Sequence, residues 1–202
     1  MVDVIQASVY TGAFFEKVSS MKNNYGDMFN HLHPDFFADE GISSLPVEEV
    51  FDEQVLDLHT WQSGIPVACP GYITFGRYEG DLQTLHDAIA LVDDDWTQWF
   101  HAGDEIFCAY DGDKVVSFCL LDAFGEYDGL RVGGPGCVGT IPAYRKLGIG
   151  LRMVQLATEE LQKAGYDLSW IHYTHVGHWY ARLGYETVVK WNSQGIVEAK
   201  VE

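Results

Sequence analysis

The residues best suited to chemistry lie in a short glycine-containing turn, Arg145-Lys146-Leu147-Gly148-Ile149-Gly150. Gly148 and Gly150 lack a Cβ, so a ligand can approach the backbone closely there. A turn that leads into a helix leaves backbone N–H groups unpaired at the positive end of the helix dipole. Arg145 and Lys146 add positive charge in a chain with 12 Lys and Arg residues. We therefore predict an anion site at this turn, best suited to phosphate.

The turn does not match the common nucleotide motifs. It lacks the Gly-Lys-Ser/Thr sequence of a Walker-type loop, and no third glycine follows three residues after Gly150, as a dinucleotide fingerprint requires. At this point an ordinary strand-to-helix turn at the surface remains the alternative interpretation.

The flanking sequence supplies the elements that would position this turn. Residues 137–141 are short, apolar and β-branched, which is typical of a strand, and Pro142 closes it. Beyond the turn, apolar residues recur at helical spacing to residue 164. With these two elements included, the same reasoning predicts strands over 72–77, 105–110, 114–121, 136–141, 168–173, 186–191 and 196–201, and helices over 81–91, 148–164 and 178–183. Residues 124–130 read as a polar loop or ragged strand.

Two motifs resemble the GCN5-related N-acetyltransferase (GNAT) superfamily. Arg-x-x-Gly-x-Gly, after a strand that ends in Pro142-Ala143-Tyr144, is similar to its acetyl-CoA-binding motif. Downstream, Trp179-Tyr180-Ala181-Arg182-Leu183-Gly184-Tyr185-Glu186 resembles its C-terminal signature, which is an aromatic residue, Tyr, two residues and Leu-Gly-aromatic-Glu. The order of strands and helices around both motifs is also that of the superfamily. The resemblance covers residues 72–202 and is weaker before Gly134.

The resemblance implies an α/β (α+β) fold. We expect a GNAT-like mixed, mostly antiparallel central sheet of about six to seven strands, flanked by helices, with splayed central strands that form an acetyl-CoA cleft. Residues 71–202 would form the transferase domain. Residues 1–70 would be an accessory segment packed on the core of this domain, since they contain too many phenylalanines for a disordered tail. Within this segment we predict a helix over 10–21, with Phe14 and Phe15, and a short amphipathic helix within 47–58.

The resemblance also assigns roles around the cofactor, acetyl-CoA. The pantetheine arm would bond like an added strand along Val138, Gly139, Thr140 and Ile141. The pyrophosphate would meet the turn residues Arg145, Lys146, Leu147, Gly148, Ile149 and Gly150. Tyr180 stands where the superfamily commonly has a general acid for the coenzyme A thiolate. Its alternative role is that of a core aromatic beside Trp179.

The proton acceptor for the amine is less defined. An alkylammonium must lose a proton before it attacks the thioester. Residues 133–136, where several members carry a glutamate, have no ionisable side chain, and Tyr173 and Thr174 replace the asparagine often seen at the next strand end. The remaining candidates are His172, His175, Asp122, Glu126 and Asp128. Of these we place His172 and Glu126 with Tyr180 in the predicted catalytic set, because histidine titrates near neutral pH. No metal site is expected, since a strand-to-loop path would scatter His172, His175 and His178.

Composition limits the partners. Thirty acidic residues against 12 Lys and Arg give a formal charge of −18, which disfavours nucleic acid and would attract cationic amines, although such charge also serves solubility. The sequence contains no apolar run long enough to span a membrane, and its N-terminus lacks the basic residues of a signal peptide. The four cysteines are dispersed, which indicates reduced thiols. We expect a cytoplasmic protein, and the oligomeric state, a homodimer included, is left open.

Three functions follow in order of preference. The first is an acetyl-CoA-dependent N-acetyltransferase for a primary amine of a small molecule or protein. The second is a non-catalytic acyl-CoA-binding regulatory or sensor module, favoured by the missing strand carboxylate. The third is an unrelated α/β structural or interaction domain.

Overall fold

The computed structural model describes residues 24–201, so the predicted helix over 10–21 with Phe14 and Phe15 lies outside the described residues. The described chain divides into two compact units, residues 50–188 and residues 24–49 with 189–201. Among these residues, every helix is too short or too polar to cross a membrane.

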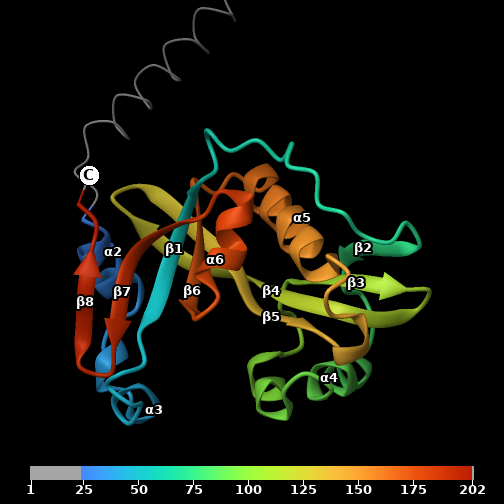
Figure 1. Ribbon diagram of the computed structural model, residues 1–202, viewed down its shortest axis with the longest axis horizontal. Coiled ribbons are helices and arrows are strands. Elements are labelled where there is room, and N and C mark those ends of the chain that lie inside the picture. Colours follow the sequence, from blue (N-terminus) through green and yellow to red (C-terminus); the bar gives the residue numbers. More distant parts are fainter. Residues whose placement is uncertain (1–23, 202) are drawn as a thin grey trace, which may run out of the picture. The chain divides into compact units, whose positions relative to one another are not determined.

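Eight strands form one mixed sheet in the order β2-β3-β4-β5-β6-β1-β7-β8 (Figure 1). The pairs β2–β3, β3–β4, β4–β5, β1–β6 and β7–β8 are antiparallel, and β5–β6 is parallel. The expected mixed, mostly antiparallel sheet with flanking helices is confirmed, with more strands than expected. The strands are β1 (Phe51–Asp57), β2 (Ile73–Arg77), β3 (Ile106–Asp111), β4 (Lys114–Tyr127), β5 (Leu130–Thr140), β6 (Leu168–Thr174), β7 (Glu186–Asn192) and β8 (Gly195–Ala199).

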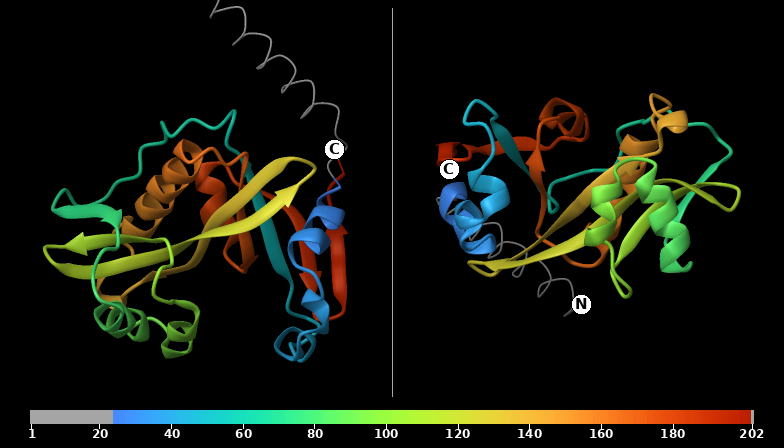
Figure 2. Two further views of the ribbon diagram at one scale, coloured as in Figure 1. Left: turned by 180° about the vertical axis from the view of Figure 1, so that it is seen from behind. Right: turned by 90° about the horizontal axis from the view of Figure 1, so that it is seen from below.

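Helices α5 (Ile149–Lys163) and α4 (Leu82–Ala90) cover opposite faces of the sheet in the larger unit (Figures 1 and 2). Side chains alternate between the two faces of a strand. Cys119 and Leu121 of β4 therefore pack in the cluster that includes α5, whereas Phe118 and Leu120 pack in the cluster that includes α4. The short helices of this unit are η2 (Asp94–Trp99), η3 (Pro142–Tyr144), α6 (Gly177–Tyr180) and η4 (Ala181–Leu183).

The extra strand is β1, and the predicted amphipathic helix within residues 47–58 is wrong. The acidic and apolar residues of this segment predict a helix with one solvent-exposed polar face and one buried apolar face. Instead β1 pairs with β6 from Asp52↔Thr174 to Asp57↔Leu168. Glu53, which the helical interpretation exposed, is fully buried. Long-range pairing overrode the local pattern, as it often does for short segments.

The remaining predicted elements from residue 72 onward are confirmed, and the hairpin of β4 and β5 is longer than predicted. Residues 124–130 were expected as a polar loop or ragged strand: residues 124–127 extend β4, Leu130 begins β5, and residues 128–129 form the turn. Asp128 and Gly129 both have positive φ there, 51° and 78°, as a tight hairpin turn requires. Asp81 caps α4, accepting a hydrogen bond from the Thr84 N–H.

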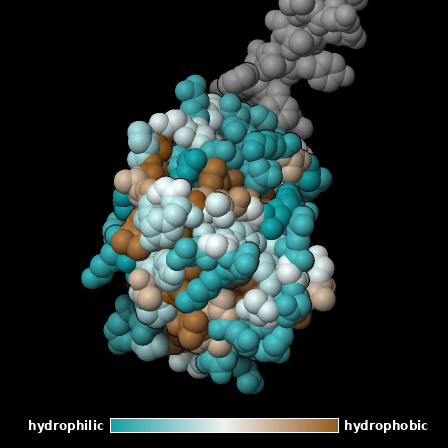
Figure 3. Space-filling view, turned by 90° about the vertical axis from the view of Figure 1, so that its right-hand side faces the viewer, coloured by the Kyte–Doolittle hydropathy of each residue, from teal (hydrophilic) through white to brown (hydrophobic). Residues whose placement is uncertain are grey.

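The smaller unit contains α2 (Tyr25–Leu32), η1 (Phe36–Ala38), α3 (Glu40–Ser43) and the hairpin strand β8. Its core is aromatic: the Phe29 ring lies 5.3 Å from Phe36, and Phe36 lies 4.8 Å from Trp191. The Tyr25 N–H donates to the Lys200 carbonyl, which ties α2 to the end of the chain. On the molecular face drawn in Figure 3, hydrophilic residues predominate and hydrophobic ones form separate patches.

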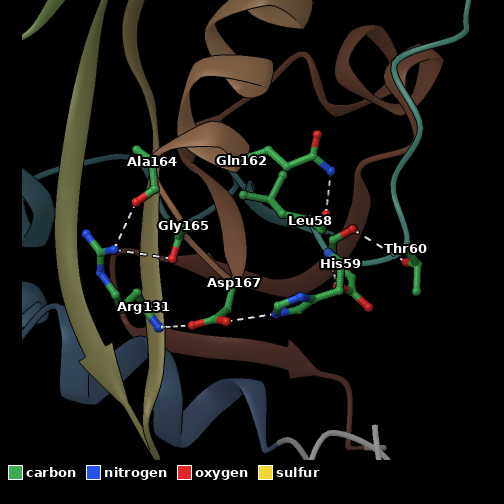
Figure 4. A network of polar contacts seen from close by, with 9 residues as sticks. Leu58, His59, Thr60, Arg131, Gln162, Ala164, Gly165 and Asp167 are labelled. Carbon is green, nitrogen blue, oxygen red and sulfur yellow. Dashed lines mark hydrogen bonds and ion pairs between the residues drawn. The ribbon is translucent and has the colours of Figure 1, made fainter. Parts of the chain in front are cut away.

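A polar network fixes the C-terminal end of α5 (Figure 4). The Arg131 guanidinium donates to the carbonyls of Ala164 and Gly165, at 3.0 and 3.3 Å. Asp167 accepts from the Arg131 N–H at 2.6 Å and faces His59 Nε2 at 2.7 Å. These bonds fix the start of β5 against the C-terminal end of α5. The turn that connects β5 to α5 is the predicted anion site.

Candidate active site

Strands β5 and β6 separate at the centre of the sheet. They pair at Val132↔Leu168 and Gly133↔Ser169, yet β5 continues to Thr140 and β6 to Thr174. Within the described residues, no further β5–β6 pair forms. The Trp170 carbonyl still approaches Gly134 closely, so the backbone edge of β5 becomes available to a ligand that bonds like an added strand beyond Gly134. We call this opening the splay.

A bulge in β5 lies at the splay. The β4–β5 ladder shifts between Leu120↔Gly136 and Phe118↔Gly139, so Cys137 and Val138 have no ladder partner on β4. Cys137 has a φ of 45°, which is unusual for a residue other than glycine. Such a bulge re-aims the backbone, and bulges are frequent next to active sites. Val138, a predicted pantetheine contact, lies in it.

The other predicted pantetheine residues lie between the bulge and the turn. The Gly139 carbonyl accepts from Ser117 Oγ at 2.6 Å, and the Thr140 carbonyl accepts from Arg145 Nε at 2.9 Å. Ile141 is buried in the core. Arg145, predicted to contact pyrophosphate, thus also anchors the end of β5.

The turn before α5 presents unused backbone donors. Gly148 is the N-cap residue of α5 with a φ of 79°, and no side chain caps the helix. Among residues 24–201, nothing accepts from the N–H groups of Lys146, Leu147 and Gly148. Lys146 and Leu147 are exposed, whereas Ile149 and Gly150 are buried. Unused donors at the positive end of a 15-residue helix are groups that can bind an anion.

Gly148 is also required by packing. A Cβ on Gly148 would lie 1.9 Å from the Ala68 carbonyl oxygen. Residues 63–70 run along α5 at this point, and Gln155 Nε2 donates to the carbonyls of Ser63 and Ile65 at 2.9 and 2.8 Å. The glycine therefore has a structural reason to be present even without a ligand.

Tyr180 lies on α6 in a buried aromatic group. Its ring is 4.8 Å from Trp179 and 6.1 Å from Tyr185. Its hydroxyl has no hydrogen-bond partner within the described part of the chain. Burial raises the pKa of Tyr180 well above its ordinary value, and nearby Tyr185 and the thiols of Cys119 and Cys137 raise it further. The phenol is a protonated donor without an internal acceptor.

Asp122 lies on the other side of the bulge. A Cβ on Gly136 would meet Asp122 Oδ2 at 2.0 Å, so the carboxyl occupies the space that this glycine leaves open. Burial raises the pKa of Asp122 to about 6, the charge of Asp104 raises it as well, and His172 opposes both effects. Burial and Asp122 together raise the pKa of Cys137 to about 12. Electrostatic coupling therefore links Asp122 to both His172 and the bulge.

His172 faces a glutamate that sequence reasoning missed. Its Nδ1 lies 3.0 Å from both carboxylate oxygens of Glu53 on β1. Glu53 does not stand out in the sequence, because the amphipathic helix predicted within residues 47–58 would place acidic residues in solvent. Strand alternation of Phe51, Glu53 and Val55 was the available signal, since it puts all three on one face.

The other candidate bases lie elsewhere. Glu126 is exposed near the tip of the β4–β5 hairpin, opposite Arg131, and roughly 16 Å of strand separates that position from Gly136. Asp128 forms the hairpin turn itself. The ring of the exposed His175 lies 3.9 Å from the Phe51 ring and is tilted by 40° to it. His172 thus lies on the part of β6 that no longer pairs with β5, Asp122 lies beside the β5 bulge, and Tyr180 packs with Val138 in the cluster that includes α5. Glu126 lies near the hairpin tip.

Residues 102–187 match the family described as an acetyltransferase (GNAT) domain. No curated protein matches the chain in sequence.

Several solved structures share the fold. One is the GCN5-related glucosamine N-acetyltransferase region of a fungal multi-domain GH3 β-N-acetylglucosaminidase, with a TM-score of 0.61 and 19% identity over 77% of this chain. A GCN5-related N-acetyltransferase from Sphaerobacter thermophilus has a TM-score of 0.53 and 16% identity over 71%. One from Kribbella flavida has a TM-score of 0.50 and 18% identity over 70%. The matches span 21%, 50% and 56% of those three chains.

Proposed function

From the premise that this chain contains a GNAT acetyltransferase domain, we propose that it transfers the acetyl group of acetyl-CoA to a cationic primary amine. The observation that carries the proposal is the junction of the β5–β6 splay with the uncapped turn before α5. This junction offers a backbone edge for the pantetheine arm and backbone donors for the pyrophosphate within one continuous segment, Val138 to Gly150.

Acetyl-CoA would bind along this segment. The N–H groups of Lys146, Leu147 and Gly148 would donate to the pyrophosphate, and the Lys146 ammonium would add charge. The pantetheine amides would bond to the β5 edge near Val138 and Gly139. The thioester carbonyl would then lie at the bulge, where a re-aimed backbone N–H can polarise it.

Tyr180 would serve as the general acid. Tyr180 is 6% exposed, its hydroxyl has no internal acceptor in the described structure, and burial raises its pKa. A coenzyme A thiolate leaving the tetrahedral intermediate would take this proton, which keeps the thiol from returning to the carbonyl.

The acceptor amine would bind on the Asp122 side of the bulge. Asp122 is half-buried and has no hydrogen-bond or ion-pair partner among the described residues, so an ammonium group would satisfy it. His172, coupled to Asp122, would remove the proton from this ammonium. The positions of the candidates favour His172 over Glu126 for this step. The acceptor can be a small molecule or the amine of a protein.

The test combines binding with turnover. Titration calorimetry with acetyl-CoA is expected to show specific binding, and release of free coenzyme A over a panel of primary amines should rise for cationic acceptors. Binding without release for any amine would favour the alternative, a non-catalytic acyl-CoA-binding module. Absence of acetyl-CoA binding would contradict both.

A further inference from the structure

We propose that Glu53, on β1, is the positioning residue that fixes His172 as proton acceptor for the amine. The inference rests on the proposed function for the chemistry, but its structural part can be tested alone. Glu53 lies on β1, outside residues 102–187, which match the acetyltransferase family.

The Glu53 carboxylate is the centre of a buried polar group. Its side chain has 0% exposure, and it accepts from Trp170 Nε1 at 2.5 Å and from the Tyr173 N–H at 3.0 Å. An ionised carboxylate is costly to bury unless several donors point at it. These donors, together with His172, provide that compensation. Both the indole and the amide can only donate, so the carboxylate is held in its acceptor form.

This arrangement decides the tautomer of His172. A carboxylate that acts only as an acceptor requires a proton on the nitrogen facing it, which is Nδ1, at 3.0 Å from each oxygen. In the neutral ring, the lone pair is then on Nε2. The imidazole side chain is 23% exposed, whereas Glu53 is completely buried, so the ring reaches from the buried carboxylate towards the surface.

The backbone beside His172 is strained in a way that serves this geometry. Tyr173 has a φ of 56°, a conformation that residues other than glycine seldom adopt. Its N–H is one of the Glu53 donors, so the carboxylate helps to hold β6 in this conformation. Strain of this kind persists where surrounding contacts determine it, and it is common at functional sites.

The reaction step can be written with all protons placed. The ammonium of the acceptor gives one proton to His172 Nε2, and the nitrogen lone pair forms the C–N bond to the thioester carbonyl. The C–S bond then breaks, and the thiolate takes the Tyr180 proton. The nitrogen loses its second proton, which restores Tyr180 through solvent, and His172 releases its proton to water. Glu53 stabilises the imidazolium without taking its proton.

Nitrogen-15 NMR of histidine-labelled protein tests the positioning directly, with the His172 signals assigned from a His172→Gln variant. The wild type is expected to show protonated Nδ1 and unprotonated Nε2 above the titration of the ring. Glu53→Gln, whose amide can donate, should shift His172 towards the Nε2–H form. A wild-type ring in the Nε2–H form would overturn the proposal, and so would an unchanged tautomer in a folded Glu53→Gln variant.

Asp167→Asn is the matched control, because Asp167 faces a different histidine, His59, at 2.7 Å. It should leave the His172 tautomer unchanged. In turnover assays Glu53→Gln should lower kcat at least tenfold with little change in KM for acetyl-CoA, and Glu53→Asp should restore part of the loss. Equal kcat in Glu53→Gln and wild type would also overturn the proposal. If no amine is acetylated, the proposed transferase function is contradicted. The NMR measurement of the His172 tautomer still tests independently whether Glu53 positions His172.

Discussion

At the scale of residues, the two buried tyrosines Tyr180 and Tyr185 differ in what their hydroxyls contact. Tyr185 Oη lies 2.7 Å from Ser169 Oγ and 2.9 Å from Thr158 Oγ1. Tyr180 lacks such a partner among residues 24–201. No protein contact in the described structure therefore accounts for the Tyr180 hydroxyl, and this hydroxyl can donate to a ligand.

This contrast yields a prediction for Tyr180→Phe. Loss of the general acid should lower kcat by about 10²-fold or more, while acetyl-CoA affinity and the melting temperature stay close to wild type. Steady-state kinetics, calorimetry and thermal melting measure the three quantities.

Tyr185→Phe is the control. It removes a hydroxyl with two protein partners, so it should destabilise the fold by about 1–2 kcal/mol without a specific loss in kcat. If Tyr180→Phe kept full turnover, Tyr180 would be a core aromatic only.

At the scale of elements, the turn before α5 combines two requirements that a single substitution can confuse. Any side chain at Gly148 would meet the Ala68 carbonyl, so a Gly148→Glu variant would disturb packing as well as an anion site. Lys146 is exposed and already has a positive φ of 66°. It can change charge without a new steric conflict.

We therefore predict that Lys146→Glu weakens acetyl-CoA binding by about tenfold, because it places a negative charge beside the diphosphate. The loss should shrink as salt concentration rises. Calorimetry at two ionic strengths measures both effects.

Lys163→Glu makes the same charge change at the other end of α5, where Lys163 pairs with Glu160 at 2.8 Å. This control should leave acetyl-CoA affinity unchanged. Equal losses in both variants would show that overall charge, and not the turn, determines affinity.

At the scale of the whole molecule, a formal charge of −18 repels itself and makes stability depend on pH. Asp122 adds a specific contribution, since its pKa in the fold is about 6 against an ordinary 3.8. Its ionised form is disfavoured by folding. Stability from this group is complete below about pH 4 and is lost as the pH rises through about 6.

We predict that Asp122→Asn removes this loss. The difference in unfolding free energy between the variant and wild type should grow in favour of the variant by about 2–3 kcal/mol from pH 4 to pH 7, from a shift of about two pKa units. Denaturant unfolding at several pH values measures this difference in unfolding free energy. Repulsion among the other acidic residues affects both proteins alike and therefore cancels in the comparison. A difference that is constant with pH would show that Asp122 titrates normally.

The sequence by itself determined the parts of this protein whose signals are local. The turn Arg145 to Gly150, the helix after it and the aromatic Leu-Gly-Tyr segment are contiguous, and glycine spacing with helical periodicity predicts them directly. The strand, turn and helix of the segment from Val138 to Gly150, which we propose to bind acetyl-CoA, were therefore predictable from the sequence.

Only the tertiary structure decided what surrounds this segment. β1 is a strand because β6 offers it a long-range partner, and Glu53 is buried because Trp170, His172 and Tyr173 supply donors to it. None of these partners lies within 100 positions of Glu53 in the sequence, so no local pattern could reveal them. The preference for His172 over Glu126 likewise depends on strand register, which places one at the splay and the other at the hairpin tip. The local periodicity of a sequence shows which side chains lie on the same face of a helix or strand. Which other element packs against that face is determined only when the chain folds.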